Sequence, residues 1–161
     1  MVVQRYRNVL EPAEGAVVLV YTADGDRGIT YYATACLGCT YRADRDGSAK
    51  LDEHRAAGLA NAHAATCRAM NCGVPGTSDG TEAAKIVRDR LWSLCQYGAN
   101  QARYISLSDF HVDRVDLQRP ADFIKETMLQ LAQAEPDFVT TEPYSTGTGT
   151  RFLVQPHPRR S

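Results

Sequence analysis

The sequence predicts an α+β protein made of two small modules, each with its own helices and strands. Three observations support this fold class. Residues 16–35 contain two β-rich apolar runs, residues 48–70 form an Ala-rich stretch with helical spacing, and a Gly/Pro/Ser-rich segment at residues 71–80 precedes further amphipathic helices. A chain of 161 residues has room for one ordinary domain or two small ones.

The composition excludes several classes of protein. With 18 Lys and Arg against 19 Asp and Glu, the net charge of −1 rules out a strongly basic nucleic-acid coat. The content of 43% hydrophobic and 23% charged residues is typical of a globular protein, and no apolar run reaches the roughly 20 residues of a membrane span. Because residues 1–15 lack the continuous apolar segment of a signal peptide, we expect a cytoplasmic protein with no membrane partner.

The first module is expected to begin with a β-hairpin. Residues 16–22 (AVVLVYT) and 28–35 (GITYYATA) are rich in strand-forming side chains, and residues 23–27 (ADGDR) between them are typical of a turn. Residues 40–49, which follow the second run, are compatible with one more short strand.

Cysteines are concentrated directly after this hairpin. The chain has five cysteines, an odd number that does not suit a complete disulfide framework in a protein without an export signal. Cys36 and Cys39 form a C-x2-C motif, and Gly38 between them allows the tight turn that directs backbone N–H groups toward sulfur. Two thiolates in this spacing can hold one side of a metal ion.

The remaining ligands are expected on the helix that follows. Residues 48–70 contain Ser48 as a candidate N-cap, with Asp52 and Glu53 in the predicted first turn. His63 and Cys67 are four residues apart and would project from one face of that helix. Cys36, Cys39, His63 and Cys67 together predict a tetrahedral Cys3His site for one structural Zn²⁺ per chain, because four protein ligands leave no open position.

Cys72, His54 and Cys95 are weaker candidates for ligands of this site. Cys72 is the main rival of Cys67 for the fourth position, because the helix should fray before residues 73–76. His54 lies two and a half turns from His63 and should point elsewhere, and Cys95 belongs to a separate helix and is expected in a core.

A strand, a C-x2-C knuckle and a helix bearing H-x3-C resemble zinc fingers of the ββα and treble-clef kinds. The residues ACLGC and ANAHAATCRA are similar to small zinc-finger proteins of actinobacterial mobile elements, and the likeness covers about residues 16–72. The 23 residues between Cys39 and His63 exceed the dozen or so of a compact finger, so groove docking by a short finger helix is not implied. We therefore predict a zinc-finger module of hairpin, knuckle and helix over residues 1–72.

The second module is expected to start with an amphipathic helix at residue 81. Apolar residues recur there with helical spacing at Ala83, Val87, Leu91 and Leu94. Asp79 or Thr81 can cap the start of this helix, and Gly98 marks its end.

Shorter elements are predicted after this helix. Residues 104–106 are extended, Ser108 can cap a short helix, and residues 115–117 form a turn. A longer helix then has Pro120 at its first position and ends at Pro136. The last two strands are predicted at residues 137–142 and 150–155, and the Thr/Gly-rich loop between them covers residues 143–149.

This order of elements resembles the winged helix-turn-helix fold. The likeness covers about residues 81–155 and rests on element order and a few apolar positions. Residues 71–80 form the predicted linker between the modules, and residues 156–161 are expected to be a disordered tail.

The winged-helix resemblance implies that the third helix docks in the major groove of double-stranded DNA and that the wing contacts the backbone. The side chains placed to do so would be Arg119, Lys125 and Gln130 on the helix, with Thr148 and Arg151 in the wing. This predicts a zinc-containing DNA-binding protein that regulates transcription.

Charge argues for an alternative partner. Residues 79–161 hold 10 basic and 11 acidic residues, and phosphate neutralisation dominates nucleic-acid affinity, so DNA binding needs charge segregation or the doubled contacts of a homodimer. The alternative function is a zinc-stabilised protein–protein interaction adaptor that does not bind nucleic acid.

An enzyme is not expected. The sequence has no phosphate-binding loop, dinucleotide fingerprint, hydrolase elbow or H-E-x-x-H motif. The remaining enzymatic alternative is a thiol redox protein that uses Cys36 and Cys39, although the residues after Cys36 make a poor helix start.

Overall fold

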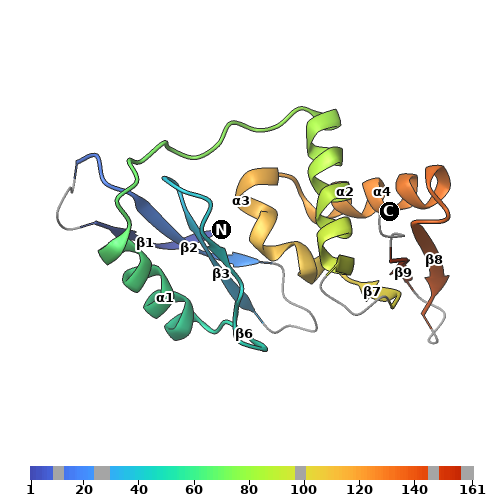
Figure 1. Ribbon diagram of the computed structural model, residues 1–161, viewed down its shortest axis with the longest axis horizontal. Coiled ribbons are helices and arrows are strands. Elements are labelled where there is room, and N and C mark those ends of the chain that lie inside the picture. Colours follow the sequence, from blue (N-terminus) through green and yellow to red (C-terminus); the bar gives the residue numbers. More distant parts are fainter. Residues whose placement is uncertain (9–12, 24–29, 97–100, 145–148, 157–161) are drawn as a thin grey trace. The chain divides into compact units, whose positions relative to one another are not determined.

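The computed structural model describes residues 1–8, 13–23, 30–96, 101–144 and 149–156 (Figure 1). It confirms a mixed α+β protein with antiparallel sheets. The chain divides into two compact units: an N-terminal unit of Met1–Thr77 and His111–Asp116, and a C-terminal unit of Ser78–Phe110 and Leu117–Ser161. Within the described residues, no helix combines the length and the apolar character needed to cross a membrane.

A four-stranded antiparallel sheet forms the base of the N-terminal unit. Its strands, in the order β1-β2-β3-β4, are Val2–Arg7, Val17–Ala23, Tyr31–Cys36 and Arg42–Ala43. The predicted hairpin is confirmed as β2 and β3, whose register pairs Val18 with Cys36. Most of its predicted turn, residues 24–27, lies outside the described residues. Strand β1 was not predicted, because its six residues, all exposed or half-buried, contain no run of buried apolar side chains.

Helix α1 (Glu53–Thr66) covers one face of this sheet. It packs through a stripe of three buried alanines, Ala56, Ala60 and Ala64, which share one face of the helix at intervals of four residues. Small side chains allow the helix to approach the strands closely, and Val18 and Val20 of β2 belong to the same buried cluster.

The predicted start of this helix was wrong. Ser48 lies in the turn between β5 (Arg45–Asp46) and β6 (Ala49–Lys50), where Gly47 has a φ of 61°. The N-cap is Asp52, whose carboxylate accepts a hydrogen bond of 2.8 Å from the backbone N–H of Arg55. A glycine in the left-handed conformation favours a tight hairpin at the position where the sequence also offered a capping serine.

The opposite face of the sheet is covered by residues from a distant part of the chain. Val17, Leu19 and Tyr21 of β2 are buried on this side together with Val115. Every residue from Val17 to Tyr21 is buried, so this part of β2 is covered on both faces of the sheet. The predicted division at residues 71–80 placed the whole of 81–155 in the second module, whereas residues 111–116 belong to the N-terminal unit.

The C-terminal unit contains helices and a three-stranded antiparallel sheet of order β7-β9-β8. Its long helices are α2 (Gly80–Gln96) and α4 (Ala121–Ala134), and its strands are β7 (Arg103–Ile105), β8 (Val139–Pro143) and β9 (Thr150–Val154). A 3-10 helix, η1 (Leu107–Asp113), and the short α3 (Arg114–Leu117) connect β7 to α4. The helices and strands follow the predicted order, but residues 115–117, predicted as a turn, lie in helix α3.

The predicted apolar stripe of α2 is confirmed, because Ala83, Val87, Leu91 and Leu94 are all buried. They share a core with Ile124 and Met128 of α4 and with Phe152 and Val154 of β9. Asp79 caps α2 by accepting the N–H of Glu82 at 2.9 Å. Pro120 is the N-cap of α4 and not its first helical residue. Gly98, residues 145–148 of the predicted loop and residues 157–161 of the predicted tail lie outside the described part of the chain.

Candidate metal centre

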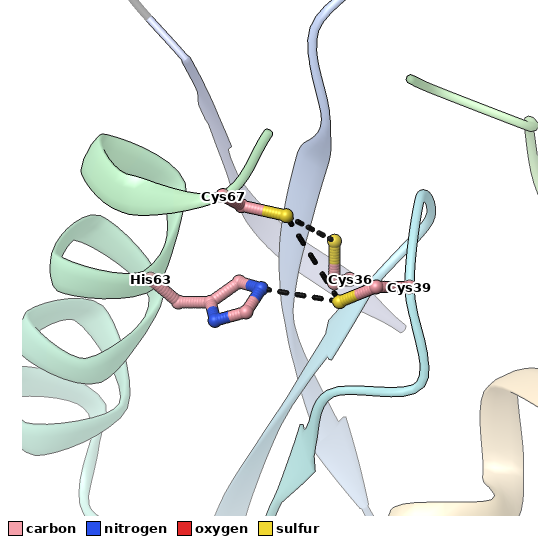
Figure 2. A group of neighbouring side chains, drawn as sticks. All are labelled: Cys36, Cys39, His63 and Cys67. Carbon is pink, nitrogen blue, oxygen red and sulfur yellow. Dashed lines mark hydrogen bonds between the residues drawn. The ribbon is translucent and has the colours of Figure 1, made fainter. Parts of the chain in front are cut away.

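The four predicted ligands lie together in the N-terminal unit (Figure 2). Cys36 ends β3, Cys39 lies in the turn after it, His63 is in the last turn of α1 and Cys67 is the C-cap of that helix. Their ligand atoms all lie within 4.8 Å of one another, so these side chains could hold one metal ion.

The separations of the ligand atoms suit a tetrahedral ion. Zn–S bonds of about 2.3 Å and Zn–N bonds of about 2.0–2.1 Å at tetrahedral angles place two sulfurs about 3.8 Å apart, and a sulfur and a nitrogen about 3.5 Å apart. The Sγ atom of Cys67 lies 4.0 Å from those of both Cys36 and Cys39. Nε2 of His63 lies 3.3 Å from Sγ of Cys39. The ligands therefore approach the geometry of a loaded site.

Backbone hydrogen bonds to sulfur define the C-x2-C turn. The N–H of Gly38 donates to Sγ of Cys36 at 3.3 Å, and the N–H of Tyr41 donates to Sγ of Cys39 at 3.5 Å. Each bond favours the negatively charged thiolate, which is the form that binds metal. The turn thus prepares both sulfurs as ligands.

Gly38 is required here by a close approach of the chain. A Cβ atom at this position would lie 2.4 Å from the carbonyl oxygen of Met70. The segment after α1 is held against the turn by a hydrogen bond of 3.0 Å from the N–H of Cys72 to the carbonyl of Leu37. Only glycine leaves room for this backbone packing.

Tyr41 fixes the orientation of the histidine ligand. Its ring stacks on the imidazole of His63 with centroids 3.9 Å apart and planes 8° apart. Burial lowers the pKa of His63, which favours the neutral imidazole that coordinates metal. Tyr41 was not singled out from the sequence; its position two residues after the second cysteine is the signal that could have identified it.

The two cysteines of the knuckle differ in acidity. Burial raises the pKa of the Cys36 thiol to about 11, against the smaller opposing effect of the Gly38 N–H. For Cys39, burial is outweighed by the Tyr41 N–H, the neighbouring thiols and the positive charge of Arg42, so its pKa is lowered. Metal binding at this site must therefore displace a proton from Cys36 at neutral pH.

Cys72, the predicted rival for the fourth position, lies outside this cluster, as do Cys95 and His54. Cys72 is exposed, and its thiol lies 3.7 Å from the carbonyl oxygen of Met70. Cys95 is buried in the core of the C-terminal unit, as predicted, and its thiol contacts the carbonyl of Val154 at 3.5 Å. His54 is exposed near the start of α1 and is not in the cluster.

The features of a redox-active C-x2-C are not found between residues 36 and 43, all of which are described. Cys36 ends a strand, and the segment after Cys39 leads into β4 and not into a helix. A buried thiol with a raised pKa is a poor nucleophile. Both cysteines belong to the four-residue cluster that could hold a metal ion.

The residues predicted to contact DNA lie in the C-terminal unit. Some of them are exposed, and others contact groups of this chain. Lys125 and Gln130 are exposed on α4. Arg119 donates a short hydrogen bond to the carbonyl of Ser78 and lies over the ring of Phe123, 5.2 Å from its centroid. Arg151 lies over the ring of Tyr104 at 3.6 Å from its centroid. Thr148, the other predicted wing residue, lies outside the described residues.

Comparisons of this chain with protein-family models, with curated proteins and with solved structures find no match. The zinc-finger and winged-helix resemblances therefore stay predictions, and the function has to be argued from the site itself.

Proposed function

We propose that Cys36, Cys39, His63 and Cys67 bind one Zn²⁺ ion whose role is structural. The observation that carries this proposal is the convergence of three sulfurs and one imidazole nitrogen within 4.8 Å. Sulfur-rich tetrahedral ligand sets favour zinc among the divalent ions common in cells. Four protein ligands leave no position for water or substrate, so the ion would hold the knuckle to the end of α1 and would not catalyse a reaction.

Elemental analysis of protein purified without added zinc tests this assignment. We expect one zinc per chain and its loss on prolonged treatment with a strong chelator. A protein with full far-UV ellipticity and no bound metal would contradict the proposal.

For the whole protein we propose a zinc-stabilised interaction adaptor. Among the exposed residues of α4, Asp122 and Glu126 are acidic and Lys125 is the one basic residue, so this surface carries more negative than positive charge. Arg119 and Arg151, the other cations predicted to reach DNA, already contact groups of this chain. Because phosphate neutralisation supplies most nucleic-acid affinity, this surface suits a protein partner better than DNA.

Two exposed tyrosines, one in β7 and one directly after β8, offer side chains that such a partner could contact. Tyr104 is 46% exposed and Tyr144 is 45% exposed, and the guanidinium of Arg151 lies 3.6 Å and 5.9 Å from their ring centroids. The Tyr104 hydroxyl donates to Glu142 at 2.8 Å, which orients the ring. Tyrosine and arginine are the residues most often responsible for affinity in protein interfaces.

The second candidate is a DNA-binding regulatory protein with a winged helix-turn-helix in its C-terminal unit. The order of elements favours it, because β7 pairs with β9 and the last two strands form a hairpin after α4. In that fold α4 would be the helix that enters the major groove, and Lys125 and Gln130 would face the bases or phosphates.

Photo-cross-linking in cells separates the two candidates. A cross-linking amino acid in place of Tyr104 should give adducts that protease destroys and nuclease leaves intact if the protein is an adaptor. The same amino acid in place of Gln130 should give nuclease-sensitive adducts if α4 reads DNA. In solution, a duplex affinity that falls steeply with salt would support DNA binding, and Lys125→Ala should reduce that salt slope by about one.

A further inference from the structure

Arg42 contacts both the metal knuckle and the segment of residues 111–116 that returns to the N-terminal unit. One terminal nitrogen of its guanidinium donates to three knuckle carbonyls: those of Cys36 at 2.9 Å, Cys39 at 3.2 Å and Tyr41 at 2.8 Å. The other side of the guanidinium forms a two-pronged ion pair with Asp116, with distances of 3.0 Å and 2.8 Å. A single side chain thus links the two metal-binding cysteines to α3.

This ion pair is a well-defined contact. The side chains of Arg42 and Asp116 are 21% and 36% exposed, so water reaches the pair only in part. Two parallel N–H to carboxylate bonds give an arginine pair geometric specificity as well as attraction. The pair also raises the pKa of Arg42, which is charged at every accessible pH.

The three carbonyls converge on Arg42 because the knuckle is closed. They belong to residues within one turn, whose shape depends on the N–H bonds from Gly38 and Tyr41 to sulfur. A bound ion would hold the sulfur atoms of Cys36 and Cys39 in fixed positions and so restrain the backbone of the turn. Without an ion, no shared ligand restrains the two thiols. The position of Arg42 is consequently expected to depend on the metal.

The returning segment has other anchors on the sheet. The Tyr21 hydroxyl donates to the carbonyls of His111 at 3.0 Å and Val112 at 3.2 Å, and the Tyr31 ring lies 6.2 Å from the His111 ring. Val115 is buried against β2 and β3. The tyrosine contacts hold the start of the segment at His111 and Val112. The burial of Val115 and the ion pair of Asp116 with Arg42 hold its end.

We propose that Arg42 is a positioning residue that couples metal occupancy to the order of residues 111–116. This inference rests on the proposed binding of zinc. When the site is loaded, Arg42 is held in place and fixes Asp116; when the site is empty, Arg42 loses its carbonyl partners and the end of the segment is released. Because α4 begins five residues after Asp116, metal occupancy is thereby communicated to the chain that enters the C-terminal unit.

Thermodynamic reciprocity supplies the decisive test. If zinc strengthens the hold on the segment, then the contact with Asp116 must strengthen zinc binding by the same factor. We expect Asp116→Asn and Arg42→Lys, in the full-length protein, to weaken zinc affinity about fivefold or more in competition with a chromophoric chelator. The asparagine keeps the size of the side chain but loses its charge, and the lysine keeps the charge but loses the planar fork.

A matched control lies in the C-terminal unit. Glu135 accepts a two-pronged ion pair from Arg88 with both distances 2.8 Å, so Glu135→Gln removes the same kind of contact away from the metal site. This variant should bind zinc as tightly as the parent. In hydrogen-exchange mass spectrometry of the zinc-loaded proteins, peptides covering residues 111–117 should exchange faster in Asp116→Asn than in the parent. In Glu135→Gln the same peptides should exchange at the parent's rate.

The outcomes distinguish the two proposals. A parent protein that binds no zinc contradicts the proposed metal site and removes the basis of the coupling. A parent and an Asp116→Asn variant that bind zinc with equal affinity leave the metal site intact and overturn the coupling. An equal loss of affinity in Glu135→Gln would also overturn it, because the effect would then be one of general stability.

Discussion

Replacing Cys39 by serine should remove the metal and unfold the N-terminal unit. The Cys39 sulfur lies 3.3 Å from Nε2 of His63 and 4.0 Å from the sulfur of Cys67, so its loss removes the contact with His63 and one of the two sulfur contacts that Cys67 makes with the knuckle. A serine hydroxyl is not deprotonated at neutral pH and does not replace a thiolate on zinc. The variant should therefore contain far less than one zinc per chain.

The size of the effect follows from how α1 is packed. Its fully buried side chains are Ala56, Ala60 and Ala64, each of which contributes one methyl group. At about 0.8 kcal/mol per buried methyl-sized group, the stripe supplies roughly 2.4 kcal/mol, whereas a structural zinc contributes on the order of 10 kcal/mol. If the proposed ion is bound, it should contribute more than the apolar stripe to holding α1 against the sheet.

Elemental analysis and far-UV circular dichroism with heating measure both consequences. Cys39→Ser should lose stoichiometric metal and the thermal transition of the N-terminal unit. The control is Cys72→Ser, because the Cys72 side chain is exposed and outside the cluster. A Cys39→Ser protein with one zinc and the parent's transition would refute the reasoning, and loss of zinc in Cys72→Ser would assign the fourth ligand to Cys72.

Three further predictions follow from the contacts described above. Gly38→Ala should lower zinc affinity and the melting temperature, because the added Cβ would lie 2.4 Å from the carbonyl oxygen of Met70. In Gly58→Ala the added Cβ has no atom within 4 Å, so this change should raise helix stability by about 0.5–1 kcal/mol. Equal effects of the two changes on the melting temperature would contradict this. Burial raises the pKa of Tyr21, so its contribution to stability is complete below the unfolded value of about 10 and declines as pH rises above it. The melting temperature should therefore drop less between pH 8 and pH 11 in Tyr21→Phe than in the parent. Equal drops in the two proteins would show that ionisation of Tyr21 is not the cause. Limited proteolysis should cut first within residues 71–80, which are almost entirely exposed, and a first cut inside residues 81–155 would show that this segment is not the accessible linker.

The metal centre could be predicted from the sequence because its information is local. C-x2-C and H-x3-C each place two ligands through a turn or a helix, and only the meeting of the two pairs requires tertiary structure. The helix that carries His63 was predicted with its start at Ser48, four residues before the true cap at Asp52. That error did not move the ligands, because their relative placement depends on the helical repeat and not on the first turn.

The covering of the sheet by residues 111–116 could not be predicted in the same way. The hydrogen bond from Tyr21 to His111 joins residues 90 positions apart, and no local spacing indicates such a pair. One indication was present in the sequence, since five consecutive apolar residues from Val17 to Tyr21 predict a strand buried on both faces. That pattern shows that the second face needs a cover without showing which part of the chain supplies it.

The charges around the knuckle explain why an arginine occupies position 42. Three thiolates and one neutral imidazole on a divalent ion would carry a net charge of −1, and Cys36 is buried. A partly buried negative charge is costly unless a cation compensates it, and the charge of Arg42 already lowers the pKa of Cys39. Asp116 in turn pairs with the side of the guanidinium that the knuckle carbonyls leave available. With the proposed ion bound, the metal cluster, Arg42 and Asp116 would form one alternating series of charges, and a change at either end should then alter the stability of the other.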